Sequence, residues 1–178
     1  MIHSLSPLPR FVFSRLALIP LLVSCAGCAG YRLGSSLPEG VASVFVPVVV
    51  NETAEPGLET AATSATIEEI QLDGSLKIAA RENADSILEI RLKRYTLTPL
   101  RYRKDQTATA QEYRLTLIAG AVLRRTSNNE ILYKSDSVSG FTTFDALADL
   151  PSARRNALPA AAKDLAHRIV RSVTGYWQ

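Results

Sequence analysis

The sequence predicts an α+β domain, a mixed sheet of four to five strands with two helices packed on one face, after a lipoprotein signal peptide. Three observations predict this class. An apolar run near the N-terminus ends in small residues and two cysteines. Several later segments alternate apolar and polar residues, as half-buried strands do. Two other segments repeat apolar residues at helical spacing, and the order of all these elements favours helices layered on one face of a sheet.

A positively charged and then apolar segment opens the chain. Arg10 and Arg15 supply the charge, and residues 11–23 are apolar except at Ser14, Arg15 and Pro20. The run is too short to span a bilayer, because a transmembrane helix needs about 20 apolar residues. It is typical of a signal peptide that is removed on export.

Two cysteines compete as the acylation site after this signal peptide. Cys25 has Leu22 three positions before it, the branched residue that a lipobox favours, whereas Cys28 has the better pair of small residues. Cleavage before Cys28 would also avoid an odd free thiol in an oxidising compartment. A CxxC redox pair or half of a metal site is disfavoured, because no strand precedes the pair and no second ligand cluster follows it. The predicted parts are a signal peptide at 1–24 or 1–27, an anchor and tether at 25–40, and one domain at 41–178.

The anchor predicts a location. Each buried methylene contributes about 0.8 kcal/mol, so two or more acyl chains such as palmitate hold a protein stably on a membrane. Neither cysteine is followed by Asp, which in many Gram-negative bacteria retains a lipoprotein in the inner membrane; Ala26 and Ala29 stand there instead. We therefore expect a lipid-anchored protein of the cell outer membrane that faces the periplasm.

Composition argues against one class of partner. Lys and Arg number 20 against 17 Asp and Glu, and removal of Arg10 and Arg15 with the signal peptide leaves 18 against 17, a net charge of +1. A near-neutral mature chain argues against nucleic acid as its partner. No later segment approaches the length of a transmembrane helix.

The domain is predicted to begin with a strand, a helix and a second strand. Residues 41–50 are apolar and rich in valine, which indicates a strand largely buried on both faces, and Pro47 places it at an edge or at a bulge. A helix is predicted from residues 55–58 to about Leu72, where Asp73 and Gly74 stop it. Its apolar face is expected to carry Leu58, Ala61, Ala62, Ala65 and Leu72. Residues 75–80 then predict a short strand, and residues 83–85 a turn.

Three strands and a helix follow. Leu88, Ile90 and Leu92 alternate cleanly within residues 86–97, but the phase then slips, which predicts a bulge near Lys93 or Arg94. The next strands are expected from about Tyr113 to Arg125 and, after a turn at 128–129, from Glu130 to about Thr143. The last helix is predicted at 151–176, with Pro159 in its first turns. Its apolar stripe is Leu158, Ala162, Leu165, Ala166, Ile169, Val170, Val173 and Trp177.

The residues give no catalytic or metal site, so we predict that the protein is not an enzyme and carries no cofactor. His3 leaves with the signal peptide, and His167 is expected at the edge of the buried stripe of the last helix. No Ser/His/Asp set can be assembled without that histidine. Residues 55–58 lack the glycines and lysine of a phosphate loop. The adjacent carboxylates of Glu68 and Glu69 are expected on a solvated helix face.

Basic residues on the predicted strands are the candidate binding site. Arg91 with Lys93, and Arg101 with Arg103, are two residues apart and therefore share a face of a strand. Paired cations suit phosphate or carboxylate groups, and Tyr102 adds an amphipathic ring. A solvated sheet face whose edge charges prevent aggregation is the competing interpretation. Further cations in this region are Arg94, Lys104, Arg114, Arg124 and Arg125.

The order of several short motifs resembles the lipopolysaccharide-assembly lipoprotein family LptE, over nearly the whole mature chain. The resemblance rests on a lipobox cysteine followed by residues 30–33, on 44–47, 51–53 and 55–59, on 72–74, on 83–88, and on a C-terminal helix that ends in Trp177. The chain departs from the commonest pattern in having Ala29 between Cys28 and Gly30, which leaves the acylation site open.

The resemblance implies a two-helix, mixed-sheet domain inside the lumen of the outer-membrane β-barrel LptD. There it would act as a plug, help the barrel to assemble and contact lipopolysaccharide. The expected contacts with lipopolysaccharide or with the barrel are Arg91, Lys93, Arg101, Tyr102 and Arg103. A second hypothesis, from another class, is a free-standing periplasmic lipoprotein that binds a small amphiphile or scaffolds another envelope complex. Such a carrier should show a cavity lined by the apolar face of the sheet.

Overall fold

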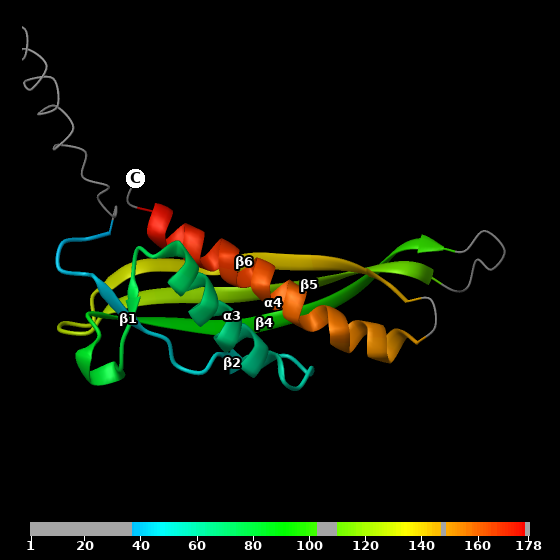
Figure 1. Cartoon of the computed structure of the whole chain (residues 1–178), viewed down its shortest axis with the longest axis horizontal. Coiled ribbons are helices and arrows are strands. Elements are labelled where there is room, and N and C mark those ends of the chain that lie inside the picture. Colours follow the sequence, from blue (N-terminus) through cyan, green and yellow to red (C-terminus); the bar gives the residue numbers. More distant parts are fainter. Residues whose placement is uncertain (1–36, 103–109, 147–148, 177–178) are drawn as a thin grey trace, which may run out of the picture. The chain divides into compact units, whose positions relative to one another are not determined.

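A mixed sheet with two helices forms the domain (Figure 1). The computed structural model describes residues 37–102, 110–146 and 149–176. In these residues six strands form one sheet in the order β3, β1, β4, β5 and β6, with β2 also paired to β4. The elements are β1 (Ser43–Phe45), β2 (Val50–Asn51), α3 (Leu58–Asp73), β3 (Lys77–Ile78), the 3-10 turn η2 (Arg81–Asn83), β4 (Ser86–Tyr102), β5 (Ala110–Arg125), β6 (Ile131–Asp145) and α4 (Leu150–Gly175). The predicted fold class is confirmed.

The valine-rich run at 41–50 forms two short strands instead of the one that was predicted. β1 lies between β3 and β4 and is parallel to both, and β2 pairs in parallel with β4 farther along. Pro47, which lacks a backbone N–H, lies in the gap between them, and this division raises the strand number to six. The prediction that the run is largely buried holds at Val44 and Val49, but Val48 is 69% exposed.

Helix α3 begins and ends at glycines in the left-handed conformation, Gly57 and Gly74, as the sequence indicated for its end. Its predicted apolar face is correct at Leu58, Ala62 and Ala65. It is wrong at Leu72, whose side chain is 67% exposed, while Ile70 is buried instead. The buried stripe moves around the helix toward its C-terminal end, so that Leu72 faces away from the core.

The central meander of β4, β5 and β6 is antiparallel and longer than predicted, because β4 extends to Tyr102 and β5 begins at Ala110. The predicted bulge is confirmed, since Leu92 pairs with Ala119 and Arg94 with Ile118, which leaves Lys93 as the extra residue. By contrast, the strand predicted at 75–80 is reduced to Lys77 and Ile78 in β3.

Helix α4 begins at Leu150, about two turns earlier than a start near Leu158 would require, so Pro159 lies in its interior and not in its first turns. Asp149 caps its N-terminus, because the Asp149 carboxylate accepts a hydrogen bond from the Ser152 backbone N–H at 3.0 Å. The predicted stripe is confirmed from Ala162 to Val173. Trp177 lies outside the described residues.

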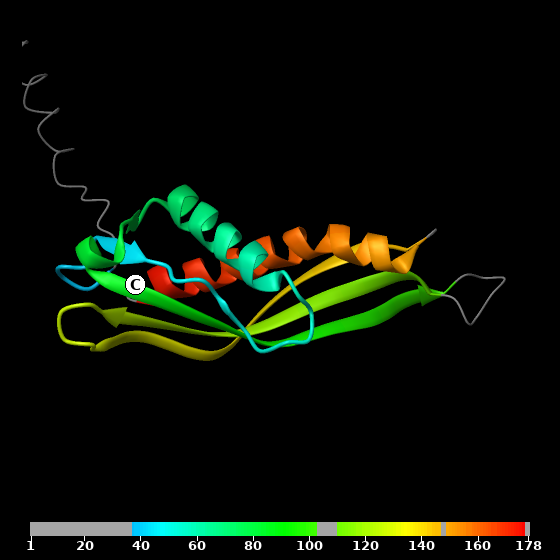
Figure 2. The same ribbon diagram turned by 90° about the horizontal axis from the view of Figure 1, so that it is seen from below.

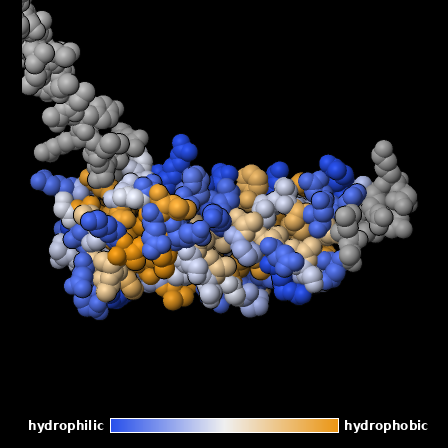
Figure 3. Space-filling view, viewed as in Figure 1, coloured by the Kyte–Doolittle hydropathy of each residue, from blue (hydrophilic) through white to orange (hydrophobic). Residues whose placement is uncertain are grey.

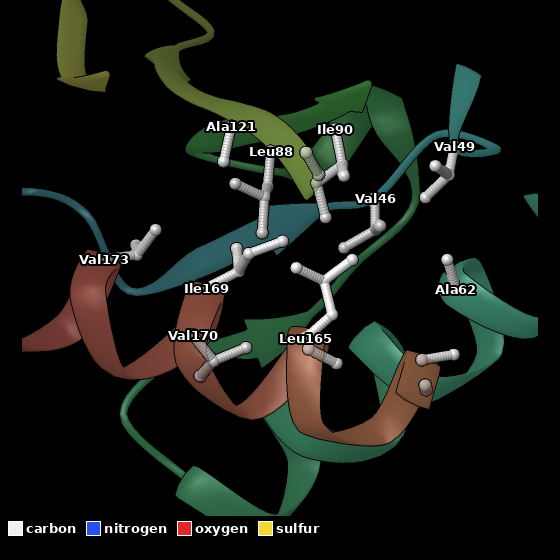
Figure 4. Packing of buried hydrophobic residues seen from close by; sticks show 14 of the residues in the cluster. Val46, Val49, Ala62, Leu88, Ile90, Ala121, Leu165, Ile169, Val170 and Val173 are labelled. Carbon is white, nitrogen blue, oxygen red and sulfur yellow. The ribbon is translucent and has the colours of Figure 1, made fainter. Parts of the chain in front are cut away.

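The core lies between the helices and one face of the sheet. Figure 4 shows Leu165 and Ile169 of α4 pointing toward Leu88 and Ile90 of β4 and Ala121 of β5. We define the covered face by the buried side chains of β4 and β5, each no more than 3% exposed: Leu88, Ile90, Leu92, Leu115, Leu117, Ala119, Ala121 and Leu123. Both helices lie on this side, as Figure 2 shows.

The opposite side of the meander has no helix over it (Figure 2). We call it the open face. Because side chains alternate along a strand, it carries the residues between those of the covered face. They are Glu89, Arg91, Arg94, Thr96 and Thr98 on β4, Arg114, Thr116, Ile118, Gly120, Val122 and Arg124 on β5, and Lys134, Ser139, Phe141 and Thr143 on β6.

Candidate functional site

The open face holds the central part of the predicted site, but the predicted residues do not form one cluster. Lys93 and Arg101 are eight residues apart on β4, a separation of about 26 Å along a strand. Arg103, Cys25 and Cys28 lie outside the described residues. The structure therefore divides the predicted contacts between the middle of the sheet and the far end of the hairpin.

Arg91 is held by an acidic neighbour. Its guanidinium lies 2.8 Å from the Glu52 carboxylate, and both side chains are about half exposed. The pair follows from the fold, because β2 pairs in parallel with β4 and the Glu52 backbone N–H donates to the carbonyl of Leu92 at 2.9 Å. Exposed ion pairs of this kind contribute only about 0 to 1 kcal/mol, so Arg91 remains available to a stronger anion.

Lys93 connects two bulges. Its ammonium group donates to the backbone carbonyl of Asp136 at 2.8 Å, and Asp136 lies in the irregular stretch where β6 shifts register against β5. Gly120 of β5 lies between them, and a Cβ atom at that position would lie 3.1 Å from the Lys93 Cε. Lys93 thus crosses β5 where that strand has no side chain, and it supports the bend of the sheet.

A shallow hollow of about 390 Å³ opens on the open face around these bulges. Its charged lining residues are Arg81, Glu89, Arg91, Lys93, Arg124 and Asp136. The Arg124 guanidinium lies 3.5 Å from the Glu89 carboxylate, so part of this charge is balanced within the hollow. The predicted pairing of Arg91 with Lys93 is correct in that both side chains line the same hollow.

The end of the hairpin carries the second predicted pair. Arg101 forms an ion pair of 3.3 Å with Glu112 across the hairpin, and the Arg101 side chain is 70% exposed. The neighbouring ring of Tyr102 is 51% exposed. These two residues are accessible, but they are far from the hollow in the middle of the sheet.

The arginines without an acidic partner are different from those that the sequence favoured. Arg81, Arg94 and Arg114 form no ion pair or hydrogen bond with any residue that the structure describes. Arg114 lies over the ring of Phe141 at 5.0 Å, and Arg81 lies over the ring of Phe45 at 5.3 Å. A stacked guanidinium keeps its N–H groups free for an anion.

Arg94 and Arg114 belong to a polar array on three strands. On the open face Arg94 pairs with Ile118, Thr96 with Thr116, and Thr98 with Arg114. The next strand adds hydroxyl groups at Ser139 and Thr143 on either side of Phe141. The sequence signal for this array is the two-residue period Arg94, Thr96, Thr98 after the bulge, which shows that these side chains share a face.

The motif at residues 51–59 has a structural role. The Asn51 amide donates to the backbone carbonyl of Glu55 at 2.8 Å and to the carboxylate of Glu59 at 2.9 Å, and its oxygen accepts from Thr53. These contacts hold the turn between β2 and α3. The hydrogen bonds of its carboxylate lower the pKa of Glu59 below its usual value.

The motif at residues 83–88 is also structural. The Asp85 carboxylate accepts from the Ser43 hydroxyl at 2.7 Å and from the backbone N–H groups of Ser43 and Ala42. The Ser43 hydrogen bond is the main cause that holds the pKa of Asp85 below its usual value. Asp85 therefore attaches β1 to the beginning of β4.

The two helices are connected by exposed polar contacts. His167 Nδ1 lies 2.7 Å from the Glu69 carboxylate, and Lys163 donates to Glu68 at 3.1 Å. His167 is exposed and lies outside the buried stripe, as predicted for an edge position. Glu68 is solvated as predicted, but the Glu69 side chain is only 14% exposed, because His167 covers it.

The described residues define a class of protein by its fold, an α+β domain with one sheet face packed under two helices and one polar sheet face. Within the described ranges, no group of three or more His, Cys, Asp or Glu side chains is placed to hold a metal ion. None of the helices in that part of the chain is long and apolar enough to cross a membrane.

The particular family follows from comparison with known proteins. Residues 41–173 match the family LptE, described as lipopolysaccharide-assembly, and the chain belongs to this family. It is a family of non-enzymatic lipopolysaccharide-assembly lipoproteins. The resemblance found in the motifs is therefore confirmed. The comparison with curated proteins gave no match.

Solved structures share the fold at low sequence identity. Uncharacterized lipoprotein B from Nitrosomonas europaea is 17% identical with a TM-score of 0.53, and the match covers 82% of this chain and 89% of that chain. A minor lipoprotein from Acinetobacter baumannii is 13% identical with a TM-score of 0.50, covering 75% and 93%. A hypothetical protein from Chlamydia trachomatis is 9% identical with a TM-score of 0.54, covering 77% and 98%. These likenesses concern the fold alone.

Proposed function

We propose that this protein is the lipid-anchored outer-membrane component of a lipopolysaccharide assembly machinery, and that it plugs an LptD-type β-barrel and assists its assembly. Family membership supports the assembly role. The observation that carries the proposal is the contrast between the two faces of one sheet, because a domain seated in a polar lumen needs a packed core on one side and a polar surface on the other.

The covered face disfavours the alternative of an amphiphile carrier. Leu115, Leu117 and Leu123 are fully buried, and the side chains of α3 and α4 fill the space over them. A carrier would need an apolar cavity at this place. The hollow of about 390 Å³ described above lies instead on the open face, and charged groups are part of its lining.

The open face suits phosphate groups. Arg94 and Arg114 are our principal candidates, because their guanidinium groups have no acidic partner among the described residues. Arginine binds phosphate oxygens through two parallel hydrogen bonds. We retain the candidates Arg91, Lys93, Arg101, Tyr102 and Arg103, since exposed ion pairs such as Arg91 with Glu52 are weak enough for a phosphate to displace.

The anchor completes the proposal. Cleavage of a signal peptide before Cys25 or Cys28 and acylation of the new N-terminal cysteine would hold residues 41–178 at the periplasmic side of the outer membrane, and within the barrel lumen once the complex forms. Two or more acyl chains are required for stable anchoring. Intact mass measurement of the mature protein identifies the cysteine that carries them.

The first experiment is a pull-down of the full-length lipoprotein from its own outer membrane in mild detergent, with mass spectrometry of the bound proteins. We expect a stoichiometric large β-barrel protein. A clean monomer without a barrel partner would contradict the plug and favour the amphiphile-binding or scaffolding alternative.

A charge-reversal experiment tests the open face itself. We expect Arg94→Glu with Arg114→Glu to weaken lipopolysaccharide binding or barrel recovery at least tenfold. The matched control is Arg155→Glu with Arg171→Glu, which makes the same charge change on exposed residues of α4. Equal loss in both double variants would show a net-charge effect and would contradict a specific site. Reversal at Arg91, Lys93, Arg101 and Arg103 tests the second set in the same assay.

A further inference from the structure

Exposed apolar side chains gather at the end of the domain where the described chain begins. Leu72, in the last turn of α3, is 67% exposed, and Ile78 of β3 is 36% exposed. Figure 3 shows hydrophobic side chains over β1, β3 and the C-terminal end of α3. Packing within the described domain does not account for them, because Ile70 and Leu76 fill the adjacent core positions.

This patch lies beside the point where the predicted tether joins the domain. The backbone turns at residues 38–41, where the Val41 N–H donates to the carbonyl of Pro38. The next contact is with β3, since the Lys77 N–H donates to the carbonyl of Ala42 at 3.0 Å. Ile78 pairs with Val44. Ile78 thus lies on the strand that is hydrogen-bonded to β1, the first strand after residue 37.

Around the patch, most of the charged side chains that form no ion pair or hydrogen bond with a described residue are positive. Lys77 is exposed, and neither it nor Arg81 forms an ion pair with a described residue. The nearby carboxylate of Asp73 accepts hydrogen bonds from the Ser75 N–H and the Thr174 hydroxyl. Exposed leucine and isoleucine beside free cations are the composition of a surface that rests on a phospholipid membrane.

We propose that Leu72, Lys77 and Ile78, the tether-root patch, contact the phospholipid surface beside the acyl anchor. This inference rests on the acylation in the proposed function. Leu37 lies twelve residue steps after Cys25 and nine after Cys28, so the extended tether spans at most about 43 Å or about 32 Å. The tether therefore keeps the patch within reach of the bilayer that holds the anchor. It brings no partner other than the membrane close to this patch.

The test uses the full-length protein, expressed so that it is processed and acylated, in vesicles of phosphatidylethanolamine and phosphatidylglycerol. An environment-sensitive fluorescent amino acid replaces Leu72 in one sample and Thr98 in the control. Thr98 is exposed on the open face near the end of the hairpin. We expect a blue-shifted emission at position 72 and at least twofold stronger quenching there by nitroxide-labelled lipids than at position 98.

The outcomes separate this inference from the proposed function. Equal quenching at both positions in an acylated protein overturns the docking alone. Emission at position 72 that shifts only when purified barrel is added, or only as protein density rises, assigns the patch to the barrel or to a second copy and also overturns it. A mature protein without acyl mass overturns the anchor and the docking together. Loss of the position 72 signal on Lys77→Glu with Ile78→Asp would support the patch as defined.

Discussion

The covered and open faces belong to the same strands but differ in burial. The side chains of the covered face are packed under the helices, and those of the open face have no helix over them. On β5, Leu117 and Ala119 are fully buried under the helices, while Thr116 and Ile118 between them lie on a face with no helix. The alternation of a strand thus produces a core on one side and a binding surface on the other. The difference teaches that stability and recognition are divided between alternate residues of β4, β5 and β6.

Two glycines show the same contrast at the level of single atoms. A Cβ at Gly140 would overlap the backbone of Leu165, because α4 packs directly on β6. A Cβ at Gly120 would meet the end of the flexible Lys93 side chain at 3.1 Å. The backbone of a helix cannot move aside as a lysine can, so the two positions should respond differently to the same methyl group.

The largest expected effect tests that contrast. Gly140→Ala should lower the free energy of unfolding by roughly 3 kcal/mol or prevent folding, whereas Gly120→Ala should cost less than about 1 kcal/mol. Urea unfolding followed by circular dichroism measures both. Similar losses in the two variants would mean that α4 does not pack on β6 as described.

Two adjacent residues of β5, one on each face, allow the cost of truncating a buried side chain to be compared with that of a partly exposed one. Leu117→Ala should destabilise the protein by about 2 to 5 kcal/mol, because it removes buried methyl groups and leaves a cavity. Ile118→Ala, one residue away on the open face, should cost about 1 kcal/mol because the isoleucine side chain is only partly buried. The comparison uses the same unfolding assay, and a larger cost at Ile118 would show that a partner or another segment covers the open face.

The carboxylate of Asp85, which holds β1, can be compared with an exposed carboxylate of the open face. Asp85→Asn should cost about 1 to 3 kcal/mol by removing the charge-assisted bonds that hold β1. The pKa of Asp85 is lowered in the folded protein, so its contribution is present above the unfolded value of about 3.9 and is lost as the pH falls through the lower folded value.

The control for that experiment is Glu89→Gln, which removes an exposed carboxylate from the open face. Thermal unfolding between about pH 2 and pH 7 compares the variants with the original sequence. The acid-side loss of stability should become shallower in Asp85→Asn and change little in Glu89→Gln. Equal changes would indicate a general charge effect and contradict the role given to Asp85.

The smallest effect on stability is expected at the free arginines. Arg94→Ala and Arg114→Ala should each change the free energy of unfolding by no more than about 0.5 kcal/mol, since surface substitutions without a partner are nearly neutral. Differential scanning calorimetry tests this on the purified protein. A loss above about 2 kcal/mol in either variant would show that the arginine supports the fold and would weaken its assignment to binding.

The elements with strong local signals could be predicted. The period of two at Leu88, Ile90 and Leu92, with its slip at Lys93, was sufficient to predict both β4 and its bulge. Gly74 correctly ended α3. These features depend on residues close in sequence, so a single segment contains the information.

The predictions that were wrong depend on contacts between distant segments. Leu72 has the spacing of a core residue, yet the path of α3 across the sheet turns it outward. Among the basic residues, composition could not separate the paired from the free. Arg91 meets Glu52 only because β2 lies beside β4, and Lys93 reaches Asp136 only because Gly120 lies between them.

The sequence by itself determined the class of fold, the family resemblance and the cationic character of the hairpin, because periodicity, motif order and composition are local properties. Tertiary structure alone decided which face of the sheet the helices cover, which arginines remain free and which apolar side chains stay exposed at Leu72 and Ile78. The physical reason is that burial and ion pairing depend on strand register and helix crossing, which join residues far apart in the chain.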